Sequence, residues 1–266
     1  MNYVILDLEF NQAFPFKTGR KFETVSDCPF EIIQIGAVKL DENLNTIGTF
    51  NAFIQPTLYR RLHPFVEKIT GIREKQLENQ PFFPEAYDNF VRFIGAEDAV
   101  LCTWGTDDVK SLFRNVYYHK LDTNTITHRY IDIQSYASNY LNYEAGKAIG
   151  LKNAILALSL ESEIPFHDAL NDAIYTARVF QIVRPEKINL MTFQPTILLV
   201  KKTKTARIST RALMKHIEDT IQRELTSEEK KLIKMSYILG QNHAFDITAP
   251  LLKKKHTTKN GSTVEE

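Results

Sequence analysis

Apolar and polar residues alternate in three short segments near the N-terminus. The segments span residues 3–10, 31–40 and 48–54, and a period of two residues is typical of half-buried strands. Three consecutive strands predict an antiparallel beginning to a sheet. Between the first two strands lies a long loop, residues 11–30, in which aromatic and basic residues interleave. We expect this loop to line a binding cleft.

From residue 84 onward the apolar spacing changes to three and four residues, which is typical of helices. Two further short strands interrupt the helical segments. Strands followed by strands mixed with helices predict an α/β fold in which helices cover a mixed sheet. The predicted helices are 84–93, 109–118, 134–142, 151–159 and 169–183, and the predicted strands are 99–103 and 130–133.

The charge balance changes near Glu186. Residues 1–186 contain 18 Lys+Arg and 24 Asp+Glu, whereas residues 187–266 contain 15 and 8. We therefore expect an acidic domain over 1–186 and a basic C-terminal extension over 187–266. Basic clusters bind nucleic acid or simply solvate a surface, and the sequence leaves both readings open.

The expected extension has its own pattern. A short apolar run, 197–200, precedes a basic stretch, 201–211, and two mainly helical segments follow. Ser209 or Thr210 is placed to cap the first helix, and Thr226 with Glu229 has the form of a capping box for the second. From Lys253 onward there is almost nothing to bury, so we expect a disordered tail.

Cysteine content and hydropathy narrow the class of protein. Cys28 and Cys102 match no metal-ligand or redox spacing, and we expect both to be reduced. No apolar run approaches the roughly 20 residues that cross a bilayer. The N-terminus also has no basic segment or cleavage site of a signal peptide. We expect a cytoplasmic protein that does not associate with membranes.

Asp7 and Glu9 form the first candidate site. They lie two positions apart within a hydrophobic strand, so their side chains emerge on one face about 7 Å apart. Such a pair can bind a metal ion. The alternative is the polar face of an exposed edge strand, which this pair alone does not exclude.

Asp107 and Asp108 form the second candidate site, where a strand ends in a glycine turn and a helix begins. Asp108 shares its helical face with Leu112 and Val116, so we expect it to point inward. Asp107 lies on the face of more polar residues and is expected to point to solvent. Either aspartate could instead only cap the helix.

His167 and Asp172 form the third candidate site. Asp172 lies in the middle of a helical stripe of small and apolar residues, and a buried carboxylate needs a partner. The alternative partner is an arginine in a structural salt bridge. His167 precedes the helix on a loop, where a histidine on its own is ordinary surface.

Together the three sites place four inward carboxylates, Asp7, Glu9, Asp108 and Asp172, in one chain without equally obvious cationic partners. Hard oxygen ligands select Mg²⁺ or Mn²⁺. A cluster of four acids suits two such ions about 3.5 to 4 Å apart.

The motifs resemble those of the DEDDh 3′-to-5′ exonucleases over roughly residues 1–186. Asp7-x-Glu9 matches the first motif, Asp108 the second, and His167 with Asp172 the third. The resemblance implies a ribonuclease H-like fold, a mixed five-stranded sheet flanked by helices, here followed by a mainly helical C-terminal extension. Residues 6–10, 29–36, 69–72 and 150–153, and the Trp-Gly element before Asp108, are similar to the Eri-type and KapD-type branch.

The resemblance also implies an activity, the stepwise removal of nucleoside 5′-monophosphates from a free 3′ end by a two-metal mechanism. Asp7, Glu9 and Asp172 would hold the metal nearer the attacking water, and Asp7 with Asp108 the metal nearer the leaving group. His167 would be the general base. The implied cofactors are two Mg²⁺ or Mn²⁺ ions, and the implied partner is single-stranded nucleic acid, with RNA favoured over DNA.

Substrate contacts are expected from stacking and backbone binding at Phe10, Thr70, Gly71 and Trp104. Core packing is the alternative for each. The sequence departs from the family at Gln34, where a glutamate is frequent, and at Phe10 and Asn11, where many members have Ala-Thr. A competing hypothesis is a non-catalytic regulatory or adaptor protein that binds a signalling partner, as the names of KapD-type relatives suggest.

Overall fold

The computed structural model describes residues 1–13, 27–95, 98–143, 147–194 and 209–241. The chain divides into two compact units, Met1–Val200 and Lys201–Glu266. None of the helices that the structure describes combines the length and the hydropathy that a membrane span requires.

The first unit is built on a mixed six-stranded sheet with the order β3-β2-β1-β4-β5-β6. Its first three strands are antiparallel, as the sequence predicts, whereas β4 and β5 run parallel to β1. The sixth strand was not predicted, and it pairs antiparallel with β5. The strands are β1 Asn2–Gln12, β2 Phe30–Leu40, β3 Thr46–Phe53, β4 Ala99–Thr103, β5 Arg129–Asp132 and β6 Met191–Thr192.

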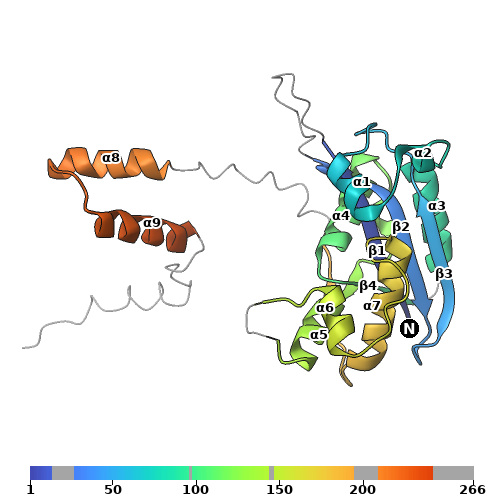
Figure 1. Ribbon diagram of the computed structural model, residues 1–266. Coiled ribbons are helices and arrows are strands. Elements are labelled where there is room, and N and C mark those ends of the chain that lie inside the picture. The colour runs from blue at the N-terminus through green and yellow to red at the C-terminus, as the bar shows by residue number, and fades with distance from the viewer. Residues whose placement is uncertain (14–26, 96–97, 144–146, 195–208, 242–266) are drawn as a thin grey trace, which may run out of the picture. The chain divides into compact units, whose positions relative to one another are not determined.

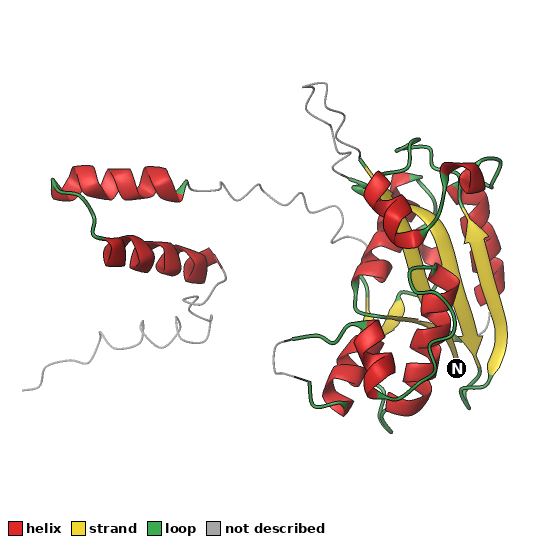
Figure 2. Cartoon of the chain, viewed as in Figure 1, coloured by secondary structure: helices red, strands yellow, loops and turns green. Residues whose placement is uncertain are grey.

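Helices cover both faces of this sheet (Figure 1; Figure 2). The predicted helices are all present, with ends shifted by at most two residues, and the predicted α/β class is confirmed. Two short helices, α1 and α2, were missed because seven- and four-residue segments show too little periodicity. The helices are α1 Pro64–Thr70, α2 Glu74–Leu77, α3 Phe83–Ile94, α4 Asp107–Tyr118, α5 Ile133–Tyr140, α6 Leu151–Ala157 and α7 Ala169–Val183, with a 3₁₀ turn at Thr123–Thr125.

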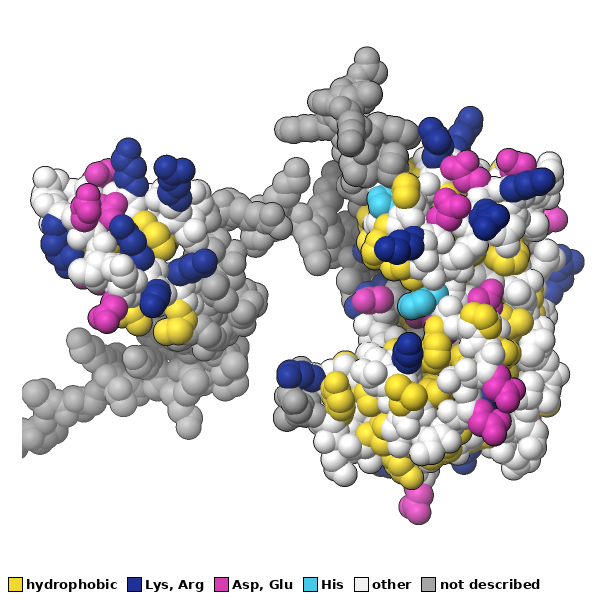
Figure 3. Space-filling view, viewed as in Figure 1, with side chains coloured by type: hydrophobic (Ala, Val, Ile, Leu, Met, Phe, Trp, Pro, Cys, Tyr) yellow, Lys and Arg dark blue, Asp and Glu magenta, His cyan; other side chains and the backbone are white. Residues whose placement is uncertain are grey.

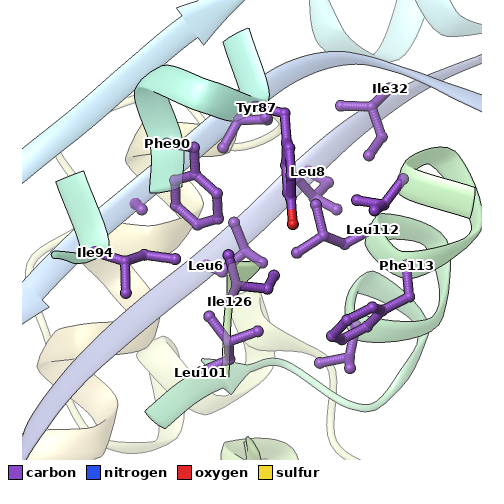
Figure 4. Close-up of a cluster of buried hydrophobic side chains, with 14 of the residues drawn as sticks. Leu6, Leu8, Ile32, Tyr87, Phe90, Ile94, Leu101, Leu112, Phe113 and Ile126 are labelled. Carbon is purple, nitrogen blue, oxygen red and sulfur yellow. The ribbon is translucent and has the colours of Figure 1, made fainter. Parts of the chain in front are cut away.

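The two faces of the sheet have separate hydrophobic cores. Leu6 and Leu8 of β1 pack with residues of α3 and α4 on one face, as Figure 4 shows. Tyr3 and Ile5 pack with residues of α5, α6 and α7 on the other. Because side chains alternate along a strand, the odd-numbered positions of β1 face α7. This alternation determines the direction in which Asp7 extends.

The first unit continues past Glu186, where the sequence predicted a domain boundary. Met191–Thr192 pairs with β5, and Phe193 is buried in the core on the α3 side of the sheet. The charge balance changes at Glu186, but the contacts of residues 191–193 show that the first unit extends past that residue.

The second unit contains α8 Thr210–Ile221 and α9 Ser227–Gln241. The two predicted helices are therefore present. The Ser209 hydroxyl accepts the N–H of Ala212, and Thr226 and Glu229 form both hydrogen bonds of a capping box. The predicted apolar run 197–200, most of the basic stretch 201–211 and the tail from Lys253 onward lie outside the described residues.

Candidate active site

Four carboxylates from three elements meet beside the sheet. Asp7 and Glu9 come from the middle of β1, Asp108 from the first turn of α4, and Asp172 from the first turn of α7. One possible ligand atom from each of Glu9, His167 and Asp172 lies within 4.8 Å of the other two. The fold therefore brings together residues that are up to 165 positions apart in the sequence.

The carboxylates affect one another's ionisation. Burial, followed by the negative charges of Asp108 and Asp172, raises the pKa of Asp7 well above its usual value. Burial and then Asp172 raise the pKa of Glu9 to about 8. Burial, Asp107 and Asp172 raise the pKa of Asp108 to about 7. The site thus concentrates negative charge that is unfavourable without a cation.

No lysine or arginine of the described residues forms an ion pair with these four carboxylates. The structural salt bridge considered for Asp172 is therefore not found there. Asp172 instead accepts the backbone N–H of His167 through Oδ2 at 3.1 Å. Its Oδ1 is buried and has no hydrogen-bond partner among the described residues. A buried oxygen left in this state fits a metal ligand, and the oxygen donors of the four carboxylates suit Mg²⁺ or Mn²⁺.

His167 adopts a left-handed backbone conformation, with φ of 65°, just before α7 begins. Histidine is one of the residues that accept this region at lower cost. Asp168 caps the helix by accepting the N–H of Asn171 at 3.1 Å. His167 is exposed, and histidine side chains reach the surface on the face that carries α1 and α7 (Figure 3). Solvent and an incoming strand can therefore reach the residue.

The structure separates the two adjacent aspartates of α4. The Asp107 side chain is 94% exposed and pairs with Lys110 at 3.1 Å. Asp108 is partly buried and lies near Asp172, whose charge helps to raise its pKa. Both directions are as predicted, and Asp108 is the aspartate that faces the cluster. The polar face used to predict the direction of Asp107 does not lie in solvent throughout, because Ser111 and Asn115 on it are buried.

The four expected substrate contacts have different surroundings. The Trp104 indole N–H donates to the carbonyl of Ile149 at 3.1 Å, and the ring packs against the core on the α7 side of the sheet. Phe10 is partly buried, with its ring centroid 6.2 Å from that of Phe30. Trp104 and Phe10 therefore pack against the cores of the protein, as the core-packing alternative predicts.

Thr70 and Gly71 form the end of α1. The Thr70 hydroxyl donates to the carbonyl of Val66 and accepts the N–H of Ile72. Gly71 has φ of 72°, and no atom lies within 4 Å of where its Cβ would be. Open space beside Gly71 leaves room for a ligand backbone, and the substrate role of this turn remains a prediction.

Two buried polar residues near the site were not singled out as site residues. The Asn11 side chain accepts the N–H of His63 and donates to two carbonyls, those of Tyr59 and Arg61. The Glu31 carboxylate accepts the backbone N–H groups of Thr57, Leu58 and Tyr59. Asn11 holds the segment before α1 against β1, the strand that carries Glu9, and Glu31 holds it against the neighbouring β2. A polar side chain within an apolar strand was the available signal for each.

The RNase_T model, described as Exonuclease, matches residues 4–180, a span that includes the four carboxylates and His167. The chain belongs to this exonuclease family. The expectation of an exonuclease is confirmed at the level of this family.

Two relatives are DNA polymerase components. The PolC-type DNA polymerase III of Caldanaerobacter subterraneus subsp. tengcongensis is 31% identical over 160 residues, which cover 56% of this chain and 10% of that polymerase. The DNA polymerase III subunit epsilon of Buchnera aphidicola is 26% identical over 218 residues, 78% of this chain and 81% of the subunit. The chain thus spans only a tenth of the first relative's length.

Among solved structures, the nuclease domain of 3′hExo, a DEDDh family member bound to rAMP, is similar with a TM-score of 0.60. The sequences are 20% identical, and the match covers 73% of this chain and 96% of that domain. This likeness confirms the ribonuclease H-like fold.

Proposed function

We propose that this protein is a divalent-metal-dependent 3′-to-5′ exonuclease. Its substrate is single-stranded nucleic acid, RNA in preference to DNA, and its products are nucleoside 5′-monophosphates. The observation that supports this most directly is the cluster of Glu9, His167 and Asp172, with a buried oxygen of Asp172 that has no protein partner among the described residues.

The four carboxylates would bind the metal ions, and His167 would transfer the proton. Asp7, Glu9 and Asp172 would hold one ion, and Asp7 with Asp108 the other. Bound Mg²⁺ or Mn²⁺ would lower the pKa of the attacking water and neutralise charge on the phosphate and the departing 3′ oxygen. His167 would accept the proton of that water, because a neutral imidazole is a competent base near neutral pH.

RNA is the favoured substrate because the similar 3′hExo domain is bound to a ribonucleotide, rAMP. The two relatives are named as a DNA polymerase and a DNA polymerase subunit, so DNA is the competing substrate. The motifs over 29–36, 69–72 and 150–153 support placement in the Eri-type and KapD-type branch. A matched set of RNA and DNA oligonucleotides, single-stranded and duplex, distinguishes these substrates.

The experiment uses the full chain, Mg²⁺ or Mn²⁺ and an oligonucleotide labelled at its 5′ end. We expect a ladder of fragments shortened from the 3′ end, lost in Asp7→Ala and His167→Ala. Asp107→Ala is the matched control, because its side chain is exposed and pairs with Lys110. If neither RNA nor DNA is shortened with either metal, the proposal is wrong.

The adaptor hypothesis has less support. Neither the described residues nor the similar proteins point to a signalling partner. It would regain support if an Asp7→Ala strain kept the cellular phenotype of the wild type.

A further inference from the structure

Two residues of β2 lie directly beside the acidic pair of β1. In the antiparallel register Gly36 is opposite Asp7, and Gln34 is opposite Glu9. Opposite residues on neighbouring strands point to the same face of the sheet. Gln34 and Gly36 therefore face α7, as the two carboxylates do.

Gly36 lets α7 approach the sheet at this point. A Cβ built on Gly36 would lie 2.1 Å from backbone atoms of Ala169 and Leu170. Only a residue without a side chain permits this contact. The first turn of α7 thus rests on the backbone of β2, next to the acidic pair.

Gln34 binds the same turn through hydrogen bonds. Its Oε1 accepts the N–H of Ala169 at 3.2 Å, and its Nε2 donates to Oδ2 of Asp168 at 2.8 Å and to Oδ1 of Asn51 at 3.0 Å. The backbone N–H can only donate, so the amide nitrogen must face the carboxylate. Gln34 is fully buried, and each of its polar atoms is satisfied.

The contacts continue from Asp168 to the reacting groups. Asp168 caps α7 through its side chain, and its carbonyl accepts the N–H of Asp172 at 2.9 Å. Asp172 in turn accepts the N–H of His167. A displacement of Asp168 would therefore move both the base and the metal ligand of the third motif relative to Glu9.

We propose that Gln34 is a positioning residue matched to Asp168. The amide of Gln34 fixes the first turn of α7, and thereby sets the separation between Glu9 and the pair His167 and Asp172. The expected effect on catalysis rests on the proposed exonuclease function. The hydrogen-bond pairing of the Gln34 amide with the Asp168 carboxylate does not depend on it.

Two substitutions together exchange the positions of the amide and the carboxylate in the Gln34–Asp168 pair. Gln34→Glu keeps the shape of the side chain and the acceptor for Ala169, but it turns a carboxylate toward Asp168. Asp168→Asn alone places an amide N–H group against the Nε2 of Gln34. In the double variant one carboxylate again faces one amide, and asparagine still caps a helix well.

The experiment compares the wild type, Gln34→Glu, Asp168→Asn and the double variant as full chains. We expect each single substitution to lower kcat about tenfold or more, since small misplacements of reacting groups are costly, with KM changed much less. Both singles should lower Tm. The double variant should recover kcat to within about threefold of the wild type and should recover most of the Tm.

The matched control is Gln181→Glu, at the other end of α7, where the amide donates only to the exposed carbonyl of Leu44. We expect it to leave kcat unchanged. A change in net charge alone would move the two single variants in opposite directions, because one adds a carboxylate and the other removes one. That outcome, or singles whose losses simply add in the double variant, would overturn the proposal.

A second readout does not depend on activity. The ring signals of His167 in NMR spectra, assigned with His167→Ala, should move in Gln34→Glu and stay in place in Gln181→Glu. If the wild type shortens no oligonucleotide, the proposed function is wrong, but the Tm cycle and the ring signals still decide whether Gln34 positions the turn. If Gln34→Glu does not fold, failure of the double variant to restore folding would overturn the proposal.

Discussion

The backbone N–H of His167 donates to Oδ2 of Asp172 at 3.1 Å. The hydrogen bond joins the proposed base to a proposed metal ligand within one helical turn, and it leaves Oδ1 of Asp172 without a protein partner among the described residues. The left-handed backbone of His167 directs its N–H toward that carboxylate. The conformation of one loop residue therefore bears on both the proposed proton acceptor and the proposed metal site.

Replacing His167 should separate these two effects. We expect His167→Ala and His167→Gly both to lower kcat by about 10² to 10⁴, the usual range for a lost general base. His167→Gly should melt at a higher temperature than His167→Ala, because glycine adopts φ of 65° without strain. Single-turnover rates and thermal melts measure the two effects. Equal activity in the wild type and both variants would remove His167 from the mechanism.

Metal-free protein should lose stability as the pH rises. The pKa of Glu9 is raised to about 8 and that of Asp108 to about 7 by burial first and then by neighbouring carboxylates. Between the ordinary carboxyl range and these values the folded state binds more protons than the unfolded state, so the free energy of unfolding falls with increasing pH.

Thermal melts in EDTA at pH 6 and pH 8 test this sign. We expect the lower Tm at pH 8, and a larger increase in Tm on adding Mg²⁺ at pH 8, because the deprotonated carboxylates bind the ion. In Glu9→Gln the difference between the two pH values should shrink. A Tm in EDTA that is higher at pH 8 than at pH 6 would contradict the prediction.

Gly36→Ala should be strongly destabilising. Its Cβ would meet the backbone of α7 at 2.1 Å, which only a shift of the helix can relieve, and we expect a loss of about 3 kcal/mol in the free energy of unfolding. Gly150→Ala is the control, because nothing lies within 4 Å of its Cβ position, and it should cost less than about 1 kcal/mol. Denaturant unfolding measures both. Equal losses would show that α7 does not need the close approach.

The C-terminal unit should contribute phosphate contacts. The described part of this unit, 209–241, holds six Lys+Arg and five Asp+Glu, and Arg223 and Lys230 already pair with Glu229 and Glu218. Most of the excess positive charge of the extension thus lies in 201–208 and 253–259. Truncation after Val200 should flatten the dependence of log affinity on log salt.

A second truncation, after Gln241, locates the effect. It keeps the helices and the basic stretch 201–208 and removes the three consecutive lysines that begin at Lys253. We expect it to have an intermediate slope. Fluorescence anisotropy with a labelled RNA at several salt concentrations gives the slopes, and an unchanged slope after truncation at Val200 would exclude the contribution.

Much of the fold could be predicted because its elements are long and periodic. Residues 99–103 and 169–183 were bounded correctly, since a run of buried residues and a stripe of small residues mark them clearly. The strand at Met191–Thr192 was missed, because two residues carry no period and pair only when β5 is already in place. The charge-based boundary at Glu186 also differs from the structural division after Val200, because the pairing of β6 with β5 is a tertiary contact that charge balance does not reveal.

The motif residues of the candidate site could also be predicted, whereas its supports could not. Asp7, Glu9, Asp108 and Asp172 are polar residues at inward positions, which a pattern reveals. The roles of Gln34 and Gly36 depend on the strand register and on contact with a helix more than 130 residues away. A single sequence does not specify which side chain will face which backbone across that distance.

The segment 57–63 has little freedom to adapt. Glu31 and Asn11 already use its backbone N–H and carbonyl groups, and both residues are buried. Any rearrangement would expose these hydrogen bonds or leave them broken inside the protein, which is costly. This segment, held by Asn11 beyond Glu9 on β1 and by Glu31 on β2, is therefore preformed. Under the proposed function, a 3′ end bound beside it would have to fit its fixed shape, and we expect discrimination there by exclusion rather than by closure around the ligand.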